Sequence, residues 1–168
     1  MIAVIIMVLS LLLDGILSNF TSYMKGDLTL FYPMLTLVSL IVIYPFFQKN
    51  KKRYLLSAFI LGIGYDLFYT NLFIFNGVIF VIMAFLIIFI YKNIPTNFLT
   101  IILYTVVVII SYEVLTSLIF IIFNLEKITL IDILYKIGHS LILNIIYVEL
   151  TYLIIKLLPR KYTKLKIN

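Results

Sequence analysis

Five ionisable side chains lie inside apolar stretches of this 168-residue chain, and they are the residues whose types could support chemistry. They are four acids and the single histidine of the chain: Asp14, Asp66, Glu113, Glu149 and His139. Carboxylates and an imidazole can exchange protons, bind a small ligand or form a coupled acid–base pair. In an apolar membrane environment each such group costs about 2.5–3.5 kcal/mol or more unless it finds a partner. Their positions therefore need an explanation.

The familiar catalytic patterns are absent from the sequence. A single histidine excludes the HExxH zinc motif, and neither the phosphate-binding G-x-x-x-x-G-K-[ST] loop nor the G-x-S-x-G nucleophile motif occurs. The chain has no cysteine, which excludes disulfides and thiolate chemistry. We therefore expect a protein that is not an enzyme and that needs no metal or cofactor.

Composition indicates the elements that must position these side chains. The chain is 64% hydrophobic and 12% charged, with a mean hydropathy of +1.21, whereas soluble domains are about half apolar and about a quarter charged. Apolar runs of about 20 residues recur, and each can cross the roughly 30 Å hydrocarbon layer as a helix. The sequence predicts an all-α integral membrane protein with a single transmembrane domain over residues 1–168.

Six transmembrane helices are predicted from the apolar runs. Their approximate ranges are 2–20, 29–47, 54–70, 73–91, 97–123 and 132–158. Residues 159–168 are expected to form a basic cytoplasmic tail. Because only a short segment separates the third and fourth ranges, a re-entrant pair over 54–91 is the alternative.

The basic residues predict the orientation. Cytoplasmic loops carry most Lys and Arg, so the clusters KNKKR at 49–53 and PRKYTKLK at 159–166 must lie on one side, with an even number of helices between them. Six spans with both termini in the cytoplasm leave three of the thirteen basic residues outside, namely Lys25, Lys127 and Lys136. The net charge of +6 is then expected to attract anionic membrane lipid rather than nucleic acid.

Helical periodicity places each buried acid among small or polar side chains. Successive residues turn by about 100°, so residues three or four apart share a face. The predicted stripes are Ala3, Met7, Ser10, Asp14 and Ser18; Ala58, Gly62, Asp66, Tyr69 and Thr70; Glu113, Thr116, Ser117 and Asn124; and Tyr135, His139, Glu149 and Lys156. Each of these helices is expected to turn its stripe into the bundle.

Two interpretations of the acids are open. With a rise of about 1.5 Å per residue, Asp14, Asp66, Glu113 and His139 fall in the outer half of the bilayer, within about 10 Å of its midplane. They can form a polar pocket that opens outward and holds a small ligand or protons, with His139 and one acid as a coupled pair. Alternatively, they hydrogen-bond between helices, at about 1 kcal/mol each.

The stretch LGIGYDLFYTNLFIFNG, residues 61–77, resembles the hallmark of the bacterial rod shape-determining protein MreD family. In that family a glycine-containing helix ends in Asp-Leu, and a short turn leads to an Asn or His at the next helix. The residues at matching spacing are Gly62, Asp66, Leu67 and Asn76. Pro33 stands in the first turn of the predicted second helix, which is similar to the family's Pro-led second span. The turn YTNLFI at 69–74 departs from the Ser-, Gly- and Pro-containing turn of the family.

The resemblance covers essentially the whole chain and implies a function. It implies a non-catalytic, multi-pass subunit of the cell-elongation machinery in the bacterial cytoplasmic membrane. Such a subunit acts with an MreC-like single-span periplasmic protein and, through it, with the RodA glycan polymerase and a penicillin-binding transpeptidase. It thereby supports peptidoglycan synthesis and cell shape.

The resemblance also implies an alternative. The family's fold is similar to the six-helix substrate-binding subunits of energy-coupling-factor transporters, so a subunit that binds a vitamin or another small molecule is the second reading. Those subunits dock on their partner through alanine-rich faces. This chain has three alanines, Ala3, Ala58 and Ala84, which disfavours the transporter reading.

The aromatic outer turn between the third and fourth predicted helices is expected to touch the partner. Tyr69, Phe73 and Phe75 place apolar rings at a water boundary, where exposed apolar groups mark interaction sites. The alternative is that these rings only anchor the turn in the headgroup layer.

Overall fold

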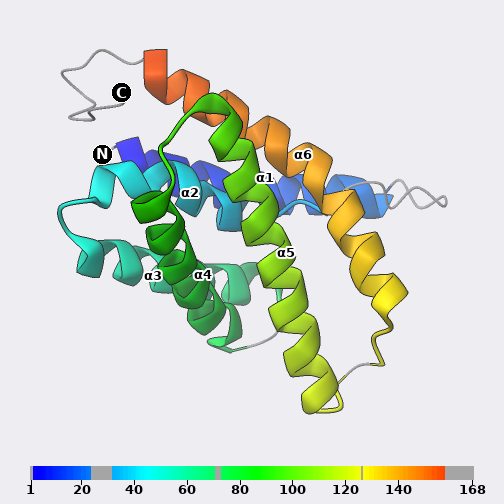
Figure 1. The fold of residues 1–168 in the computed structure, drawn as a ribbon. Helices are drawn as coiled ribbons and strands as arrows, with labels where there is room; N and C mark the ends of the chain where they lie inside the picture. The colour runs from blue at the N-terminus through cyan, green and yellow to red at the C-terminus, as the bar shows by residue number, and fades with distance from the viewer. Residues whose placement is uncertain (1, 24–31, 71–72, 126, 158–168) are drawn as a thin grey trace.

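The computed structural model describes residues 2–23, 32–70, 73–125 and 127–157. Within these ranges every regular secondary-structure element is a helix. The helices follow one another along the chain as α1 (Ile2–Tyr23), α2 (Leu35–Phe47), α3 (Lys51–Tyr69), α4 (Phe75–Asn93), α5 (Phe98–Ile122) and α6 (Leu130–Leu157) (Figure 1). The prediction of an all-helical fold is confirmed.

The helix boundaries agree with the predicted ranges to within three residues, except at the start of α2. α3 begins at Lys51, earlier than predicted, because the side chain of Asn50 accepts a hydrogen bond from the backbone N–H of Arg53 at 3.1 Å. An asparagine at this position caps the first turn of a helix. Part of the basic KNKKR cluster therefore lies in the first turn of α3.

α2 starts later than predicted, at Leu35 rather than at residue 29. Residues 29–31 lie outside the described residues, and residues 32–34 are not helical. Pro33 lacks an N–H group and restricts Tyr32 to extended conformations. Pro33 therefore stands before the helix and not in its first turn, which corrects the prediction.

α2 is the central helix of the bundle. It packs against each of the other five helices, and all its residues from Leu35 to Tyr44 are buried. Its sequence, LTLVSLIVIYPFF, has apolar residues on every side, as expected for a helix surrounded by others. The side chains that hold the start of α2 therefore matter for the packing of the whole bundle.

The remaining helices surround α2. In Figure 1 the start of α1, the end of α6 and the turn between α2 and α3 lie at the same side of the molecule, on the left. α3 and α4 pack against each other, and α5 and α6 are joined by the yellow connection at the lower right. The KNKKR cluster therefore lies at the same end of the bundle as the end of α6, while residues 159–166 lie outside the described residues.

Three helices are long and apolar enough to cross a membrane: α4, α5 and α6. The described part of α1 (residues 2–18) and α2 are shorter apolar helices, while α3 opens with three basic residues. The described residues therefore show three candidate spans, whereas six spans stay a prediction. The predicted basic tail, 159–168, lies outside the described residues.

Large apolar side chains are exposed along the outer helices. Examples from four helices are Leu12, Phe89, Leu103 and Leu150. A water-soluble protein rarely exposes so many large apolar side chains in contiguous patches. Such a surface suits contact with lipid chains.

Candidate functional site: polar contacts at the starts of α2 and α4

The carboxylate of Asp14, on α1, holds the start of α2. Its Oδ1 accepts a hydrogen bond from the backbone N–H of Leu35, and its Oδ2 accepts one from that of Thr36, both at 2.7 Å. Asp14 is 1% exposed. The first N–H groups of a helix have no partner within the helix, and they carry the positive end of its dipole. Asp14 satisfies two of them and brings the negative charge that this end favours.

Asn144, on α6, holds the residues just before α2. Its Oδ1 accepts a hydrogen bond from the backbone N–H of Met34 at 2.9 Å, and its Nδ2 donates to the carbonyl of Tyr32 at 3.0 Å. The side chain of Met34, the N-cap residue, makes no cap hydrogen bond. The start of the central helix is therefore capped by two residues distant in sequence, Asp14 and Asn144.

The carboxylate of Asp66, near the end of α3, holds the start of α4. Its Oδ2 accepts a hydrogen bond from the backbone N–H of Asn76 at 2.8 Å. Its Oδ1 accepts from the Asn76 side-chain amide at 2.7 Å and from the Thr70 hydroxyl at 2.6 Å. Asp66 and Asn76, two residues of the resemblance motif, are thus direct partners. Three donors surround a side chain that is 5% exposed.

α5 joins this contact through Tyr112, whose hydroxyl donates to Oδ1 of Asn76 at 2.8 Å. Gly62 lets α3 and α4 approach closely at the same place, because a Cβ atom there would lie 2.3 Å from the carbonyl oxygen of Asn76. Of the other motif residues, Leu67 is exposed on α3, and Pro33 is buried before α2. The resemblance motif is thus chiefly a joint between three helices.

Asp14 and Asp66 follow one pattern. Each acid lies in the second half of one helix and accepts N–H groups from the first turn of the next helix in the chain. The charges of both acids and of Glu113 act on Tyr65, which is also on α3.

Glu113, on α5, differs from the other two acids. It is 5% exposed, yet within the described ranges no hydrogen bond or ion pair reaches its carboxylate. Lys136, on α6, is its nearest electrostatic partner among the basic residues. Glu113 therefore keeps the capacity to take up a proton or to contact a small molecule.

His139 and Glu149 do not join the cluster. Both are only half-buried. His139 stacks on Tyr135, with ring centroids 3.8 Å apart, and its Nδ1 lies 2.8 Å from the carbonyl oxygen of Tyr135. In the part of the chain that the structure describes, no contact joins His139 to an acid, so the coupled pair that the sequence suggested is not formed.

The stripe predicted on α6 is wrong, and this explains the two misplaced residues. The buried side chains of α6 are Ser140, Asn144, Val148, Thr151, Tyr152 and Ile155. A helix in lipid is apolar on its outer face as well, so apolar periodicity does not distinguish the two faces. Small and amide side chains carry the signal instead, and Asn144, within an apolar run, was the residue to notice.

The predicted partner contacts fall into three environments. The Tyr69 hydroxyl donates to the carbonyl of Leu11 on α1, and its ring lies against Gly15. Phe75 packs against Phe120 with ring centroids 5.4 Å apart. Phe73, in contrast, is 79% exposed. Of the three, Phe73 is the one with a largely free ring.

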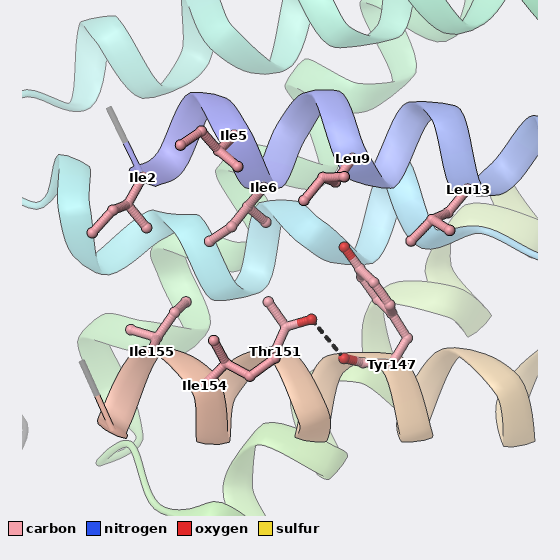
Figure 2. Close-up of a pocket in the computed structure, with 9 residues that line it drawn as sticks. All are labelled: Ile2, Ile5, Ile6, Leu9, Leu13, Tyr147, Thr151, Ile154 and Ile155. Atoms are coloured by element: carbon pink, nitrogen blue, oxygen red, sulfur yellow. Dashed lines mark hydrogen bonds between the residues drawn. The ribbon is translucent and has the colours of Figure 1, made fainter.

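An apolar groove of about 390 Å³ lies between α1 and α6 (Figure 2). Its lining consists of Ile2, Ile5, Ile6, Leu9, Leu13, Tyr147, Thr151, Ile154 and Ile155. The hydroxyls of Tyr147 and Ser10 are 2.6 Å apart and bridge the two helices, and the Thr151 hydroxyl donates to the Tyr147 carbonyl within α6. The described residues of the groove are mostly aliphatic, and none of them is charged.

The residues that sequence reasoning did not single out are polar groups with partners distant in the sequence, namely Tyr112, Asn144 and Tyr147. Ser10 and Thr70, which were placed on the stripes of Asp14 and Asp66, also form hydrogen bonds here, Ser10 with Tyr147 and Thr70 with Asp66. Within the described residues, no three His, Asp or Glu side chains are placed so that they could hold a metal ion. The hydrogen bonds of these polar side chains fix helices to one another.

Comparison with known families decides the assignment. The model of the rod shape-determining protein MreD family matches residues 1–162. The chain belongs to the MreD family. It is therefore a rod shape-determining membrane protein, and the resemblance stated from the motif is confirmed. No curated protein and no solved structure matches the chain.

Membership in the MreD family gives the buried acids a context. The family consists of non-catalytic, shape-determining membrane proteins that work in a complex with MreC. The motif residues Gly62, Asp66 and Asn76 meet at the joint between α3 and α4. In this chain the hallmark of the MreD family is a structural joint.

Proposed function

We propose that this chain is a non-catalytic subunit of the cell-elongation complex, with six transmembrane spans and both termini in the cytoplasm. In this role it binds an MreC-like single-span periplasmic protein. Through that partner it supports peptidoglycan synthesis by the RodA glycan polymerase and a penicillin-binding transpeptidase. The family match over residues 1–162 is the observation that carries the proposal.

The hydrogen bonds that Asp14 and Asp66 accept support a non-catalytic role. Asp14 and Asp66 together accept five hydrogen bonds, three of them from backbone N–H groups at helix starts. A carboxylate committed in this way is a poor candidate for a general acid or base, because proton uptake would break the contacts that it makes. Their chemistry is used to position helices.

The surface around Phe73 is the proposed contact with the partner's periplasmic part. Phe73 is strongly exposed next to the α3–α4 joint, and a large exposed ring at an outer turn favours contact with another protein. Phe73 lies two residues before α4, whose start is held by the joint.

Pull-down from native membranes tests this proposal. The tagged chain should retain an MreC-like protein, and Phe73→Glu should reduce the retained amount several-fold. Phe123→Glu is a matched control, since Phe123, at the end of α5, is 70% exposed against 79% for Phe73. If both variants retained equal amounts of the MreC-like protein, Phe73 would not be part of the contact. If the unmodified chain retained no MreC-like protein, the proposed function itself would be contradicted.

A second candidate function, binding of a small molecule, rests on Glu113. A carboxylate that is almost fully buried in an apolar bundle normally has a partner. Among the described residues, Glu113 has the charge of Lys136 but no hydrogen bond to its carboxylate. The same pull-down separates the two candidates. A stoichiometric vitamin or nucleobase that is lost in Glu113→Gln would support the small-molecule role.

A further inference from the structure

A polar pocket of about 360 Å³ lies at the start of α6, apart from the groove between α1 and α6. It is lined by Tyr32, Lys127, Ile128, Asp132, Tyr135 and Lys136. Small-molecule sites usually occupy about 300–1,000 Å³, so the pocket is large enough for a headgroup or a small anion.

The pocket carries an excess of positive charge. Within the described residues, neither Lys127 nor Lys136 forms an ion pair. Among the described lining residues the acid is Asp132, whose Oδ2 accepts hydrogen bonds from the Thr129 N–H at 2.8 Å and from the Thr129 hydroxyl at 2.7 Å. The described lining therefore has two ammonium groups and one carboxylate, and the charge of Lys136 also acts on Glu113 of α5.

The direction of α6 adds to this charge. Residues of the first turns of α6, which begins at Leu130, line the pocket. The N-terminal end of a helix carries a partial positive charge and favours anions. The two lysines and the start of α6 thus both favour binding of an anion in the pocket.

The distribution of basic residues makes the two lysines unusual. The six-span topology, on which this inference rests, leaves three basic residues outside, and two of them line this one pocket. The positive-inside rule works against basic residues on that side, so it does not account for the pair.

The neighbouring surface indicates what kind of anion would bind. Leu130, Ile131 and Leu134, in the first turns of α6, are strongly exposed apolar side chains. Tyr32 and Tyr135 line the pocket itself, and tyrosine rings prefer the headgroup layer of a membrane. A cationic pocket bordered by apolar side chains matches an amphiphile with an anionic head and an acyl tail.

We propose that this pocket binds the phosphate group of an anionic phospholipid of the outer leaflet, with Lys127 and Lys136 as its ligands. The acyl chains then lie along Leu130, Ile131 and Leu134. A bound lipid at this place ties the start of α6 to the membrane surface.

Lipid binding to the full chain in detergent tests the proposal. Phosphatidylglycerol is the probe, phosphatidylcholine is the comparison without net charge, and native mass spectrometry measures the affinity for the first bound lipid. A lysine near an anionic headgroup contributes about 1 kcal/mol, so Lys127→Gln and Lys136→Gln should each weaken phosphatidylglycerol binding about fivefold. Lys92→Gln, at the end of α4, is the control and should change nothing.

Three outcomes would overturn the proposal. The first is equal affinity for the two lipids, and the second is equal binding by the Lys127→Gln and Lys92→Gln variants. The third is binding of inorganic phosphate at Lys127 and Lys136 without binding of phosphatidylglycerol, which would assign the pocket to a free anion. Lys127 lies outside the helices, so its variant stays informative even if Lys136→Gln fails to fold. Labelling of a Lys127→Cys variant shows independently on which side of the membrane residue 127 lies. A wrong six-span topology can therefore be distinguished from a failure of lipid binding.

Discussion

At the scale of single residues, two of the buried acids, Asp14 and Asp66, are acceptors for backbone N–H groups. Asp14 lies 21 residues before Leu35 in the sequence, yet its carboxylate takes the first N–H groups of α2. Burying a charge in an apolar bundle is costly, and a helix start offsets that cost because it supplies donors and a favourable dipole together.

Replacing Asp14 by asparagine tests this role. The amide keeps one acceptor and turns its NH₂ group toward the second backbone N–H, so one donor of α2 is left unsatisfied. We expect Asp14→Asn to lower the free energy of unfolding by about 1–3 kcal/mol, measured as thermal or denaturant unfolding of the purified protein in detergent.

Glu149→Gln is the matched control for Asp14→Asn. Glu149 is also an acid within an apolar helix, but it is half-buried. Its substitution should change the stability by less than about 0.5 kcal/mol, the usual range for surface positions. Equal losses in the two variants would show that the contact with α2 is not what makes Asp14 important.

The sequence predicted which acids are buried better than it predicted their partners. Asp14, Asp66 and Glu113 are buried because they share faces with small or polar residues. The partner of Asp66 was predictable, since Asn76 follows across a short turn. The contact of Asp14 with the start of α2 was not, because the chain between them gives no local constraint on where α2 begins.

At the scale of elements, α1–α2 and α3–α4 are built on the same plan. In each pair an acid in the second half of the first helix caps the start of the second helix. In the α3–α4 pair a glycine also allows close packing, since a Cβ at Gly62 would collide with the backbone of Asn76 and Gly77.

Gly62→Ala should separate α3 from α4. The added methyl group would lie 2.3 Å from the Asn76 carbonyl oxygen, and backbone atoms cannot move aside as a flexible side chain can. We expect a loss of about 1–3 kcal/mol, typical of overpacking, seen as a lower melting temperature.

Gly138→Ala provides the comparison. A Cβ at Gly138, on α6, meets nothing within 4 Å. Alanine is the better helix former by about 1 kcal/mol, so this variant should be neutral or more stable. If Gly62→Ala were equally harmless, the close approach of α3 and α4 would be wrong.

Helix positions were largely predictable from the sequence, whereas the inward face of α6 was not. Long apolar runs with polar ends fix where helices begin and end, to within three residues at most ends. The exception at α2 arises because Pro33 delays the start and long-range side chains supply the cap. The face that a helix turns inward depends on its neighbours, which a single sequence does not contain.

At the scale of the whole molecule, the proposed topology makes a direct prediction. The chain has no cysteine, so single cysteines can be introduced at residues 51, 73, 96 and 127 without background labelling. A membrane-impermeant maleimide on intact cells should label positions 73 and 127, while positions 51 and 96 should react only after the cells are opened.

The same labelling separates six spans from a re-entrant pair over residues 54–91. In the re-entrant arrangement the turn between α3 and α4 does not reach the outer side. Position 73 would then stay unlabelled on intact cells, and the six-span topology would be wrong.

The central claim is that Asp66 and Asn76 serve to join α3 to α4 and that no reaction takes place at the Asp66 carboxylate. Exchanging the two side chains of the α3–α4 joint should therefore preserve function. In Asp66→Asn alone, one of the three donors around position 66 loses its acceptor. Adding Asn76→Asp restores the pair with the roles reversed. The new amide at position 66 can accept the backbone N–H of residue 76 and donate to the new carboxylate, to which Tyr112 still donates.

The deciding measurement is cell shape, with the amount of folded protein measured in parallel, in cells whose own copy is replaced by each variant. We predict that Asp66→Asn reduces folded protein and rod shape together, and that the exchange variant restores both. Restored folded protein in cells that stay round would contradict the account, because it would show that a carboxylate at position 66 acts chemically.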